Sequence, residues 1–353
     1  MSARVTAMVR DLEERGDASR ESLALLLSAT GEEMAALLAA GDRARAAAAG
    51  DEVHLRALIE FSNHCRRNCR YCGLRRDHRA LRRYRMSPEE IVDASRSAAA
   101  VGFGTVVLQS GEEPHYSADL LADTVRAIRM ECDAAITLSI GERPEADYRV
   151  LREAGADRFL LRMETSSPAL YRRLHPDSDW RQRLACLDSL WRLGYQVGSG
   201  VMIGLPGQSA EMLAEDLLFL RSLDLDMIGV GPFIPHPATP LAGSASGALD
   251  LSLRFIACLR LLCPEALIPA TTALDALHPR GRLLALRVGA DVLMPDVTPA
   301  RYQEHYQLYP GRPGASGGPA ESRAWAEAAV VSLGRRVALG YGHTRRGRVA
   351  SHA

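Results

Sequence analysis

The chain has 353 residues, 47% of them hydrophobic, so it is long enough to bury a large core. Its 43 basic and 43 acidic residues cancel, and a formal net charge of zero gives no electrostatic case for a nucleic-acid partner. The N-terminus is polar and charged, and no apolar run approaches the ~18 residues of a membrane span. We therefore expect a cytoplasmic protein, away from membranes, with reduced cysteines.

Helical periodicity dominates the first fifty residues, with helices expected at 5–15, 22–27 and 31–49. Thr30 and Glu33 have the spacing of a capping box at the start of the third helix. We expect residues 1–50 to form a helical extension that packs outside the main domain. No motif in this segment points to chemistry.

Apolar strands alternate with helices from residue 53 onward. The expected strands are 53–62, 102–110, 135–140, 157–162, 196–203, 227–231, 267–270 and 291–294. Eight repeated strand–helix units predict an α/β fold, a complete (βα)8 barrel of TIM type over residues 51–310. The loops that follow the strands then build one active face. Residues 311–353, rich in glycine and arginine, form a C-terminal segment that we expect to be partly mobile.

Three of the seven cysteines, Cys65, Cys69 and Cys72, fall within eight residues, spaced C-x3-C-x2-C after the first predicted strand. Three thiolates on one short loop can bind three irons of a cubane cluster, which leaves the fourth iron without a protein ligand. An open iron can bind and activate a small molecule, whereas a fully ligated cluster mainly passes electrons. Tyr71, just before the third cysteine, is placed to shield one side of the cluster.

Zinc is the alternative for clustered cysteines, but structural zinc usually takes four ligands, often from two C-x2-C pairs. His64 is the nearest fourth donor, and its position directly beside Cys65 gives it poor reach. The spacing therefore favours an iron–sulfur cluster over zinc. Arg66, Arg67 and Arg70 surround the loop with positive charge, from which we expect the thiolate form of the cysteines to be favoured.

Polar residues follow the predicted strands at the end where a barrel carries its active face. Gly111 permits close backbone approach to a ligand, and Glu112 is placed to accept hydrogen bonds from an ammonium group. Arg162 and Glu164 share one face of the fourth strand, so each needs the other or a ligand as its partner. Arg183 opens a later helix and is suited to gripping a carboxylate.

Further candidates lie on the strands themselves. Thr137 and Ser139 alternate along the third strand, so both can face the lumen. Thr271 and Thr272 put two hydroxyls at the mouth, where they suit an anion or a carboxylate. Soft walls of the cavity are the expected role of Met227 and Met294, with ordinary core packing as the other interpretation.

The cysteine spacing, with an aromatic residue before the last cysteine, resembles that of the radical S-adenosylmethionine (SAM) enzymes. Within that superfamily the chain resembles the HydE family of [FeFe]-hydrogenase maturases, relatives of biotin synthase. The matching blocks are HCRRNCRYCGLR (64–75), LQSGE (108–112), the ET of LLRMET (160–165), GYQVGSGVMIGLPGQ (194–208), DMIGVGPFIPHP (226–237), IPATTA (268–273) and YQLYPG (306–311).

The resemblance implies a complete (βα)8 barrel with a [4Fe-4S] cluster and SAM at its top. It implies that Cys65, Cys69 and Cys72 hold the cluster. It implies a SAM site lined by Tyr71, Gln109, Gly111, Glu112, Ser139, Glu164 and Arg183. It implies a substrate cavity lined by Thr137, Arg162, Met227, Thr271, Thr272, Met294 and Tyr306. It further implies reductive SAM cleavage to a 5′-deoxyadenosyl radical, used in assembling the diiron centre with its dithiolate bridge.

Two positions depart from the family pattern. Met163 stands where the family motif LRHET has a histidine, which changes the surroundings of the cavity or cluster. Family members often carry a second cysteine cluster after YPG, whereas residues 311–322 read GRPGASGGPAES. We therefore expect no second iron–sulfur cluster.

Three functions stay open at this point. The first is the maturase, with a small organometallic substrate, a ferredoxin or flavodoxin as electron donor, and the other maturases as partners. The second is a related radical SAM enzyme acting on another small, amino-acid-like substrate. The third is a non-enzymatic iron–sulfur scaffold or carrier, which needs an exposed, labile cluster and no SAM pocket.

Overall fold

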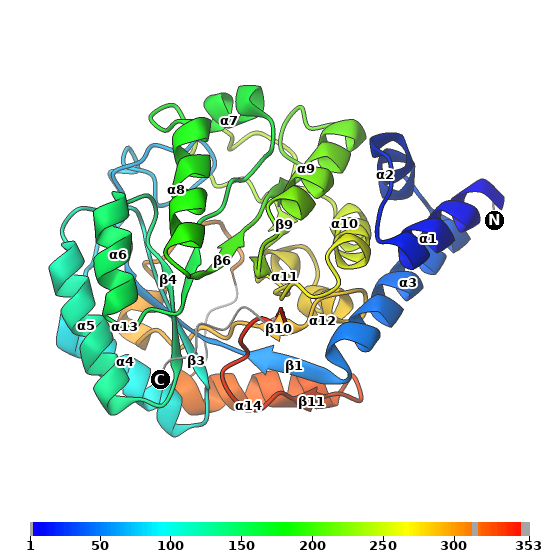
Figure 1. The fold of residues 1–353 in the computed structure, drawn as a ribbon. Coiled ribbons are helices and arrows are strands. Elements are labelled where there is room, and N and C mark those ends of the chain that lie inside the picture. The colour runs from blue at the N-terminus through cyan, green and yellow to red at the C-terminus, as the bar shows by residue number, and fades with distance from the viewer. Residues whose placement is uncertain (1–2, 313–316, 347–353) are drawn as a thin grey trace.

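Eight parallel segments form a closed ring in the computed structural model, which describes residues 3–312 and 317–346 (Figure 1). Six of them pair in the order β2-β3-β4-β5-β6-β8. Their bounds are Ala57–Ser62, Thr105–Ser110, Ala135–Ser139, Arg158–Leu160, Gln196–Ser199 and Met227–Ile228. Single parallel bridges from Met227 to Leu267 and from Pro269 to Val292 continue the ring. β10 (Val292–Leu293) then pairs with β1 (Glu52–Leu55), which runs into β2 and so closes the predicted barrel.

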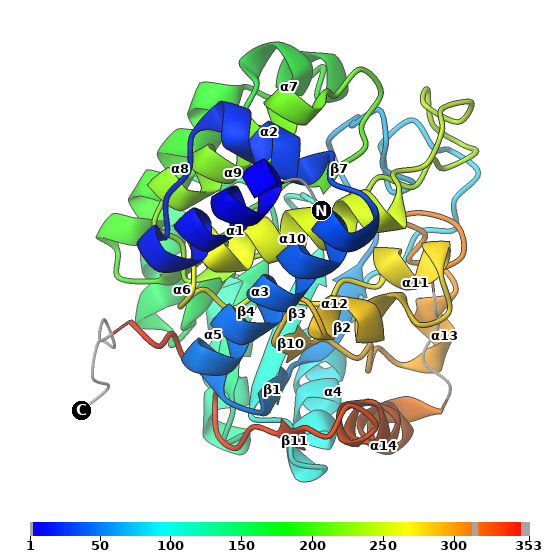
Figure 2. The same ribbon diagram turned by 90° about the vertical axis from the view of Figure 1, so that its right-hand side faces the viewer.

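Helices surround this ring and cover its outer face (Figures 1 and 2). They are α4 (Pro88–Ala100), α5 (Ala118–Glu131), α6 (Glu145–Glu153), α7 (Pro168–Leu174), α8 (Trp180–Arg192), α9 (Ala210–Ser222), α10 (Leu249–Leu262), α11 (Ala273–Leu277), α12 (Gly281–Leu286) and α13 (Ala300–Gln303). A short pair, β7 (Met202–Ile203) and β9 (Gly231–Pro232), extends two strands toward the mouth of the barrel. Apolar side chains such as Phe159 and Phe255 fill the layer between strands and helices.

Helix starts follow local sequence signals in one case and not in another. Ser87 caps α4 with a complete capping box, in which its hydroxyl accepts from the Glu90 backbone and the Glu90 side chain accepts in return. The capping box expected at Thr30 is wrong. Thr30 is the N-cap of its helix, yet its side chain makes no capping hydrogen bond. The spacing of Thr30 and Glu33 therefore predicts where the helix begins but not a side-chain hydrogen bond at its cap.

The N-terminal helices α1 (Ala3–Arg15), α2 (Arg20–Leu27) and α3 (Gly31–Ala49) pack on the outside of the barrel, mainly against α9 and α10 (Figure 2). No single helix among the described residues is long and apolar enough to cross a membrane. α2 and α3 would pass such a test only as a pair, across a bend of 114°.

The C-terminal segment covers the foot of the barrel, opposite α7 (Figures 1 and 2). It contains α14 (Gly318–Val331), which the sequence did not predict, and β11 (Arg336–Val337), which pairs with β1. Beyond β11, the carbonyl of Tyr341 accepts from the fully buried Arg158 at 2.6 Å. The mobility expected for this segment falls on residues 313–316 and 347–353, which lie outside the described residues.

Candidate active site

The cysteine loop leaves β2 at the mouth of the barrel, where the half-buried Arg83 and the buried Asn63 hold its backbone. Arg83 donates to the carbonyl oxygens of Leu74 at 2.9 Å and Arg75 at 2.7 Å, and also to that of Asn63. The Asn63 amide donates to the carbonyls of Arg82 and His305 at 2.8 and 2.7 Å. Arg83 and Asn63 therefore fix the loop from both sides. Neither stood out in the sequence, because arginine and asparagine are common in loops.

The three cysteines are free and partly exposed. Burial raises the pKa of Cys72 to about 12, and burial also raises the pKa of Cys65 and Cys69. The expectation that nearby arginines favour the thiolates is thus wrong for the protein without metal. Arg66 and Arg67 form ion pairs with Glu112, at 2.8 and 2.6 Å, and not with the cysteines. The thiols must lose protons when they bind metal.

Among the described residues, no three His, Cys, Asp or Glu side chains converge as ligands of one metal ion would. A cluster makes a different demand, since each thiolate binds its own iron. Close packing brings the loop against the next strand. A Cβ on Gly111 would lie 2.1 Å from the His64 carbonyl oxygen and 2.8 Å from the Cys65 Cβ. Gly111 therefore admits the cysteine loop, in addition to any ligand.

A cavity of about 310 Å³ opens beside Cys72 within the mouth of the barrel. Its lining includes ten of the residues singled out in the sequence: Tyr71, Cys72, Gln109, Ser139, Arg162, Glu164, Thr271, Thr272, Met294 and Tyr306. They come from the cysteine loop, from β3 and β4, and from segments that follow β5, the 267–269 bridges and β10. Sequence positions far apart thus meet at one chamber, as the strand ends of a barrel require.

Tyr71 on the cavity wall is held by a histidine. Its hydroxyl lies 3.0 Å from Nε2 of His175, and the two rings meet edge to face. Burial lowers the pKa of His175 to about 3, and Arg183 adds to the effect, so the ring is neutral at ordinary pH. His175 follows α7 in an arginine-rich stretch, and no local pattern distinguished it.

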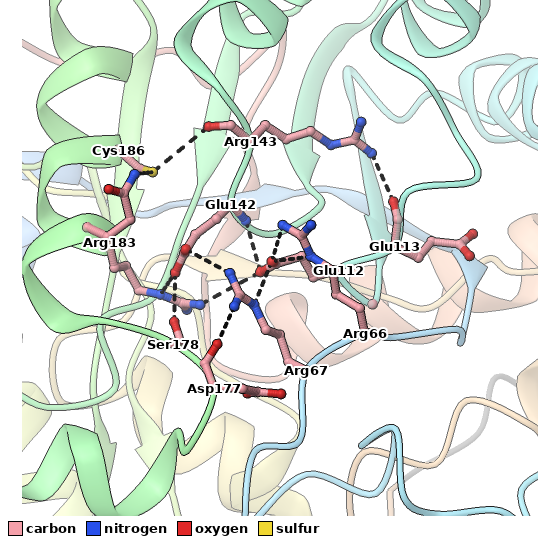
Figure 3. Close-up of polar contacts among 12 residues, drawn as sticks. Arg66, Arg67, Glu112, Glu113, Glu142, Arg143, Asp177, Ser178, Arg183 and Cys186 are labelled. Atoms are coloured by element: carbon pink, nitrogen blue, oxygen red, sulfur yellow. Dashed lines mark hydrogen bonds and ion pairs between the residues drawn. The ribbon is translucent and has the colours of Figure 1, made fainter.

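Glu112 and Arg183 belong to an ionic network just outside the cavity lining (Figure 3). Arg67 bridges Glu112 and Glu142, at 2.6 and 2.9 Å. Arg183 donates to Glu142 at 2.7 Å and lies 3.9 Å from Glu112. The Glu142 backbone also donates to Glu112 at 3.1 Å. Glu142 is the centre of the network, and the sequence did not single it out for a role.

The ion pair expected between Arg162 and Glu164 is present at 2.9 Å. Its geometry is incomplete: Glu164 Oε2 is the oxygen that lies close to Arg162, yet among the described residues it accepts no well-aligned hydrogen bond, and Arg162 donates to the Val201 carbonyl. Glu164 also has a positive φ of 67°, which is unusual for a residue other than glycine. Asp216 supports the turn after it by accepting from the Ser166 backbone at 2.6 Å. The buried Glu164 carboxylate thus has hydrogen-bonding capacity that Arg162 does not use.

Glu60 and Arg312 form a second charged pair in the cavity that the sequence did not reveal. Arg312 lies 2.5 Å from Glu60 and 3.5 Å from Asp296. Burial raises the pKa of Glu60 to about 8, although Arg312 opposes the shift. Glu60 sits within a strand that reads as apolar, and Arg312 lies beyond the predicted barrel. Tyr309, which hydrogen-bonds Thr272, was missed in the same way.

Three residues of interest lie outside the cavity lining. Thr137 is two residues deeper along β4 than Ser139 and is buried, and its hydroxyl has no hydrogen-bond partner among the residues that the structure describes. Met227 packs with Leu267 and Val292. Met163, at the position of the family histidine, is fully buried in the main apolar core. Its side chain contributes to packing and does not face the cavity.

The residues present fit a cluster and a ligand with amino and carboxylate groups. Cys72 gives the cysteine loop a direct opening into the cavity, and the other two thiols lie on the same loop. The incompletely hydrogen-bonded carboxylate of Glu164 suits a cationic group, whereas Arg162 and the paired threonines suit an anionic one.

Comparison with known proteins gives the family. Residues 59–220 match the family model described as the Radical SAM superfamily. The chain is 53% identical over 277 residues to the [FeFe] hydrogenase maturase subunit HydE of Thermotoga maritima, covering 78% of this chain and 79% of that protein. It is 30% identical to 3-methylornithine synthase of Methanosarcina acetivorans, over 69% of each chain.

Solved structures agree with the fold. Methylornithine synthase (PylB) superposes with a TM-score of 0.81 at 26% identity, covering 94% of this chain and 97% of that one. The maturase HydG superposes with a TM-score of 0.83 at 18% identity, covering 96% and 76%, and supports the fold alone. The chain therefore belongs to the radical SAM superfamily, whose enzymes bind a [4Fe-4S] cluster and SAM, and within it to the HydE family.

Proposed function

We propose that this chain is a radical SAM maturase that acts in assembling the diiron centre of [FeFe]-hydrogenase, including its dithiolate bridge. The observation that carries the proposal is a three-cysteine loop that opens, at Cys72, onto a cavity of about 310 Å³ inside a closed barrel. The identity of 53% to a HydE subunit supports the pathway.

In this proposal Cys65, Cys69 and Cys72 hold the cluster. A [4Fe-4S] cluster bound in this way supplies one electron that cleaves SAM to methionine and a 5′-deoxyadenosyl radical. Tyr71, Gln109, Ser139 and Glu164 line the SAM side of the cavity, and Glu164 offers its carboxylate to the SAM ammonium group. Gly111, Glu112 and Arg183 act from behind this wall, because their contacts fix the cysteine loop and the Glu142 network.

The remaining cavity residues form the substrate side. Arg162, Thr271, Thr272, Met294 and Tyr306 line it, and Thr137 and Met227 support its floor. A small iron–cysteine species with carbonyl and cyanide ligands has the size and carboxylate chemistry that such a lining accepts. An acidic one-electron carrier, a ferredoxin or flavodoxin, supplies the electron, and the other maturases hand on substrate and product.

A second enzyme function has a specific observation in its favour. Methylornithine synthase shares the fold over 97% of its own length, and the chain is 30% identical to a curated member of that family. An amino-acid-like substrate would use the same arginine and threonine groups for its carboxylate. Formation of a rearranged amino acid from any common amino acid would favour this function over the maturase.

Anaerobic reconstitution tests the proposal. The purified chain is loaded with iron and sulfide, then given SAM and dithionite, and 5′-deoxyadenosine is measured. The maturase account expects its formation, and expects the chain to support activation of apo-hydrogenase when the other maturases are present. Cluster loading without SAM cleavage would identify a scaffold instead. If the chain cleaved SAM but did not support hydrogenase activation, the second function, that of a methylornithine-synthase-type enzyme, would be favoured.

A further inference from the structure

The segment that carries the cysteine loop is strongly basic. Residues 66–85 contain nine arginines and one acid, Asp77, in a chain whose formal net charge is zero. A concentration of one sign on a neutral protein marks a local surface property rather than a general affinity for polyanions.

Most of these arginines are already engaged. Arg66, Arg67 and Arg85 pair with buried glutamates, and Arg83 holds backbone carbonyls. Arg75 and Arg76 share Asp77, and Arg76 also reaches Asp177 at 3.3 Å. Within the described residues, ion pairs therefore leave three exposed cations of this segment unmatched: Arg70, Arg79 and Arg82.

These three residues flank the cysteine loop, and we name them the arginine rim. Arg70 directly follows Cys69, and its backbone donates to the Leu174 carbonyl at 2.9 Å. The stretch carrying Arg79 folds back on the loop, because His78 contacts the Gly73 carbonyl at 2.7 Å. The carbonyl of Arg82 accepts from Asn63, which precedes the loop.

The rim extends onto a neighbouring helix. Arg172 and Arg173 are exposed in the last turn of α7, whose terminal carbonyl at Leu174 receives the Arg70 backbone hydrogen bond. The acids beside the rim, Asp77 and Asp177, are both shared with Arg76. Positive potential is thus not cancelled at the place where the cysteine loop reaches the surface.

We propose that the arginine rim is the docking surface for an acidic one-electron carrier protein, which delivers its electron to the cysteine loop beneath. This inference rests on the proposed function, because a SAM-cleaving cluster needs an external electron for each reductive cleavage. The cavity that would hold SAM lies on the Cys72 side of the loop, so the carrier approaches from the other, exposed side. Charge complementarity would raise the rate of encounter roughly 10- to 1000-fold at low ionic strength.

The test compares charge reversal at the rim with charge reversal elsewhere. The rim variant is R70E/R79E/R82E. The matched control is R10E/R15E/R287E, which alters three exposed arginines on α1 and after α12 and changes the net charge equally. Both are loaded with cluster, and iron content and the spectrum of the reduced cluster are recorded first. Intact clusters show that the substitutions have not disturbed the loop.

Reduced flavodoxin and dithionite then serve as alternative electron sources. For the rim variant we expect the apparent KM for flavodoxin to rise at least about tenfold at low salt, with the dithionite-driven rate unchanged. Direct titration with flavodoxin should show the same loss of affinity, and its salt dependence should flatten. The control variant should match wild type in every measurement.

Equal flavodoxin kinetics in the rim and control variants would overturn the inference. So would binding of a single-stranded oligonucleotide that is lost in the rim variant while flavodoxin kinetics stay intact, because the rim would then serve another partner. Failure of the proposed function looks different: wild type with dithionite would form no 5′-deoxyadenosine, whatever the donor affinity.

Discussion

Glu60 at the mouth of the barrel and Asp291 at its foot are both buried carboxylates paired with arginine, yet their pKa values move in opposite directions. Burial alone would raise the pKa of Asp291, but ion pairs with Arg260 and Arg345 and a backbone hydrogen bond from Ile268 lower it. For Glu60 burial dominates, because within the described part of the chain Arg312 is the one arginine paired with it, and Asp296 adds a like charge.

The difference indicates that the charged groups at the foot stabilise the fold, whereas those at the mouth bind ligand. At the foot, two arginines pair with the single carboxylate of Asp291, and this keeps the carboxylate ionised and stabilises the fold at neutral pH. At the mouth, the incompletely hydrogen-bonded carboxylate of Glu164 borders the cavity, where a ligand can reach it, whereas the incompletely hydrogen-bonded Arg260 at the foot is enclosed by protein. Substitutions at the mouth should therefore change ligand binding more than stability, and substitutions at the foot should do the reverse.

The largest effect is expected at the cysteine loop. Cys69→Ala should abolish both cluster loading and 5′-deoxyadenosine formation while the protein stays folded, because the thiol supplies one of three iron ligands. Iron analysis, circular dichroism and product assay check this. Cys132→Ala, a free buried cysteine at the end of α5, is the matched control and should keep its cluster. Equal iron content in the two variants would contradict the assignment.

The foot should respond through stability. Arg260 is fully buried and donates to the carbonyls of Gly289 and Ala266, both at 2.8 Å, besides pairing with Asp291. Arg260→Ala should lower the free energy of unfolding by about 3–5 kcal/mol, since it leaves a buried charge partly unpaired. Urea unfolding measures this, with the exposed Arg287→Ala as a near-neutral control. If Arg260→Ala kept the wild-type free energy of unfolding but bound SAM more weakly, the contrast between foot and mouth would be wrong.

Glu164 tests the mouth. Glu164→Gln should weaken SAM binding about 10- to 100-fold, because a charge-assisted hydrogen bond to the ammonium group is lost. Titration of the reconstituted protein measures the affinity, and iron content should match wild type. Glu131→Gln, on the exposed end of α5, should bind SAM normally. Unchanged affinity in Glu164→Gln would remove this residue from the SAM site.

The smallest effect concerns pH. Because the folded pKa of Glu60, about 8, lies above its ordinary value of 4.5, the folded state binds this proton more tightly than the unfolded chain does. Stability from this group is therefore complete below pH 4.5 and is lost as pH rises toward 8. Between pH 5 and 8.5, wild type should lose stability as this carboxyl ionises, and Glu60→Gln should lose less. Parallel curves for the two proteins would contradict the raised pKa.

Much of this molecule could be predicted from local patterns. The cysteine spacing marked the cluster loop, and alternation of apolar strands and helices predicted the barrel. The cysteine loop, the strand ends and the family resemblance together gave ten of the cavity positions. The strand at 267–270 is present only as single bridges, because one residue on each side meets the pairing geometry. The helix α14 was missed because glycine-rich residues at 311–318 obscured its start.

The unpredicted site residues share a physical reason. Glu60, Glu142, His175 and Arg312 have long-range partners in the site: Ser178 lies 36 residues from Glu142, Tyr71 lies 104 residues from His175, and Glu60 and Arg312 are 252 residues apart. Arg312 gave no local signal, since an arginine after a barrel ordinarily faces solvent, and Glu60 reads as a charge within a strand. Such pairs are set by the closure of the ring, which brings its first strand beside its last.

The central claim is that three cysteines on one loop leave an iron open to SAM beside the cavity. Electron–nuclear double resonance of the reduced cluster tests this claim most directly. The SAM used carries nitrogen-15 in its amino group and carbon-13 in its carboxylate. The account predicts hyperfine coupling of both labels to the cluster in wild type. Purified protein that binds zinc, or a cluster that shows no coupling to either label, would contradict it.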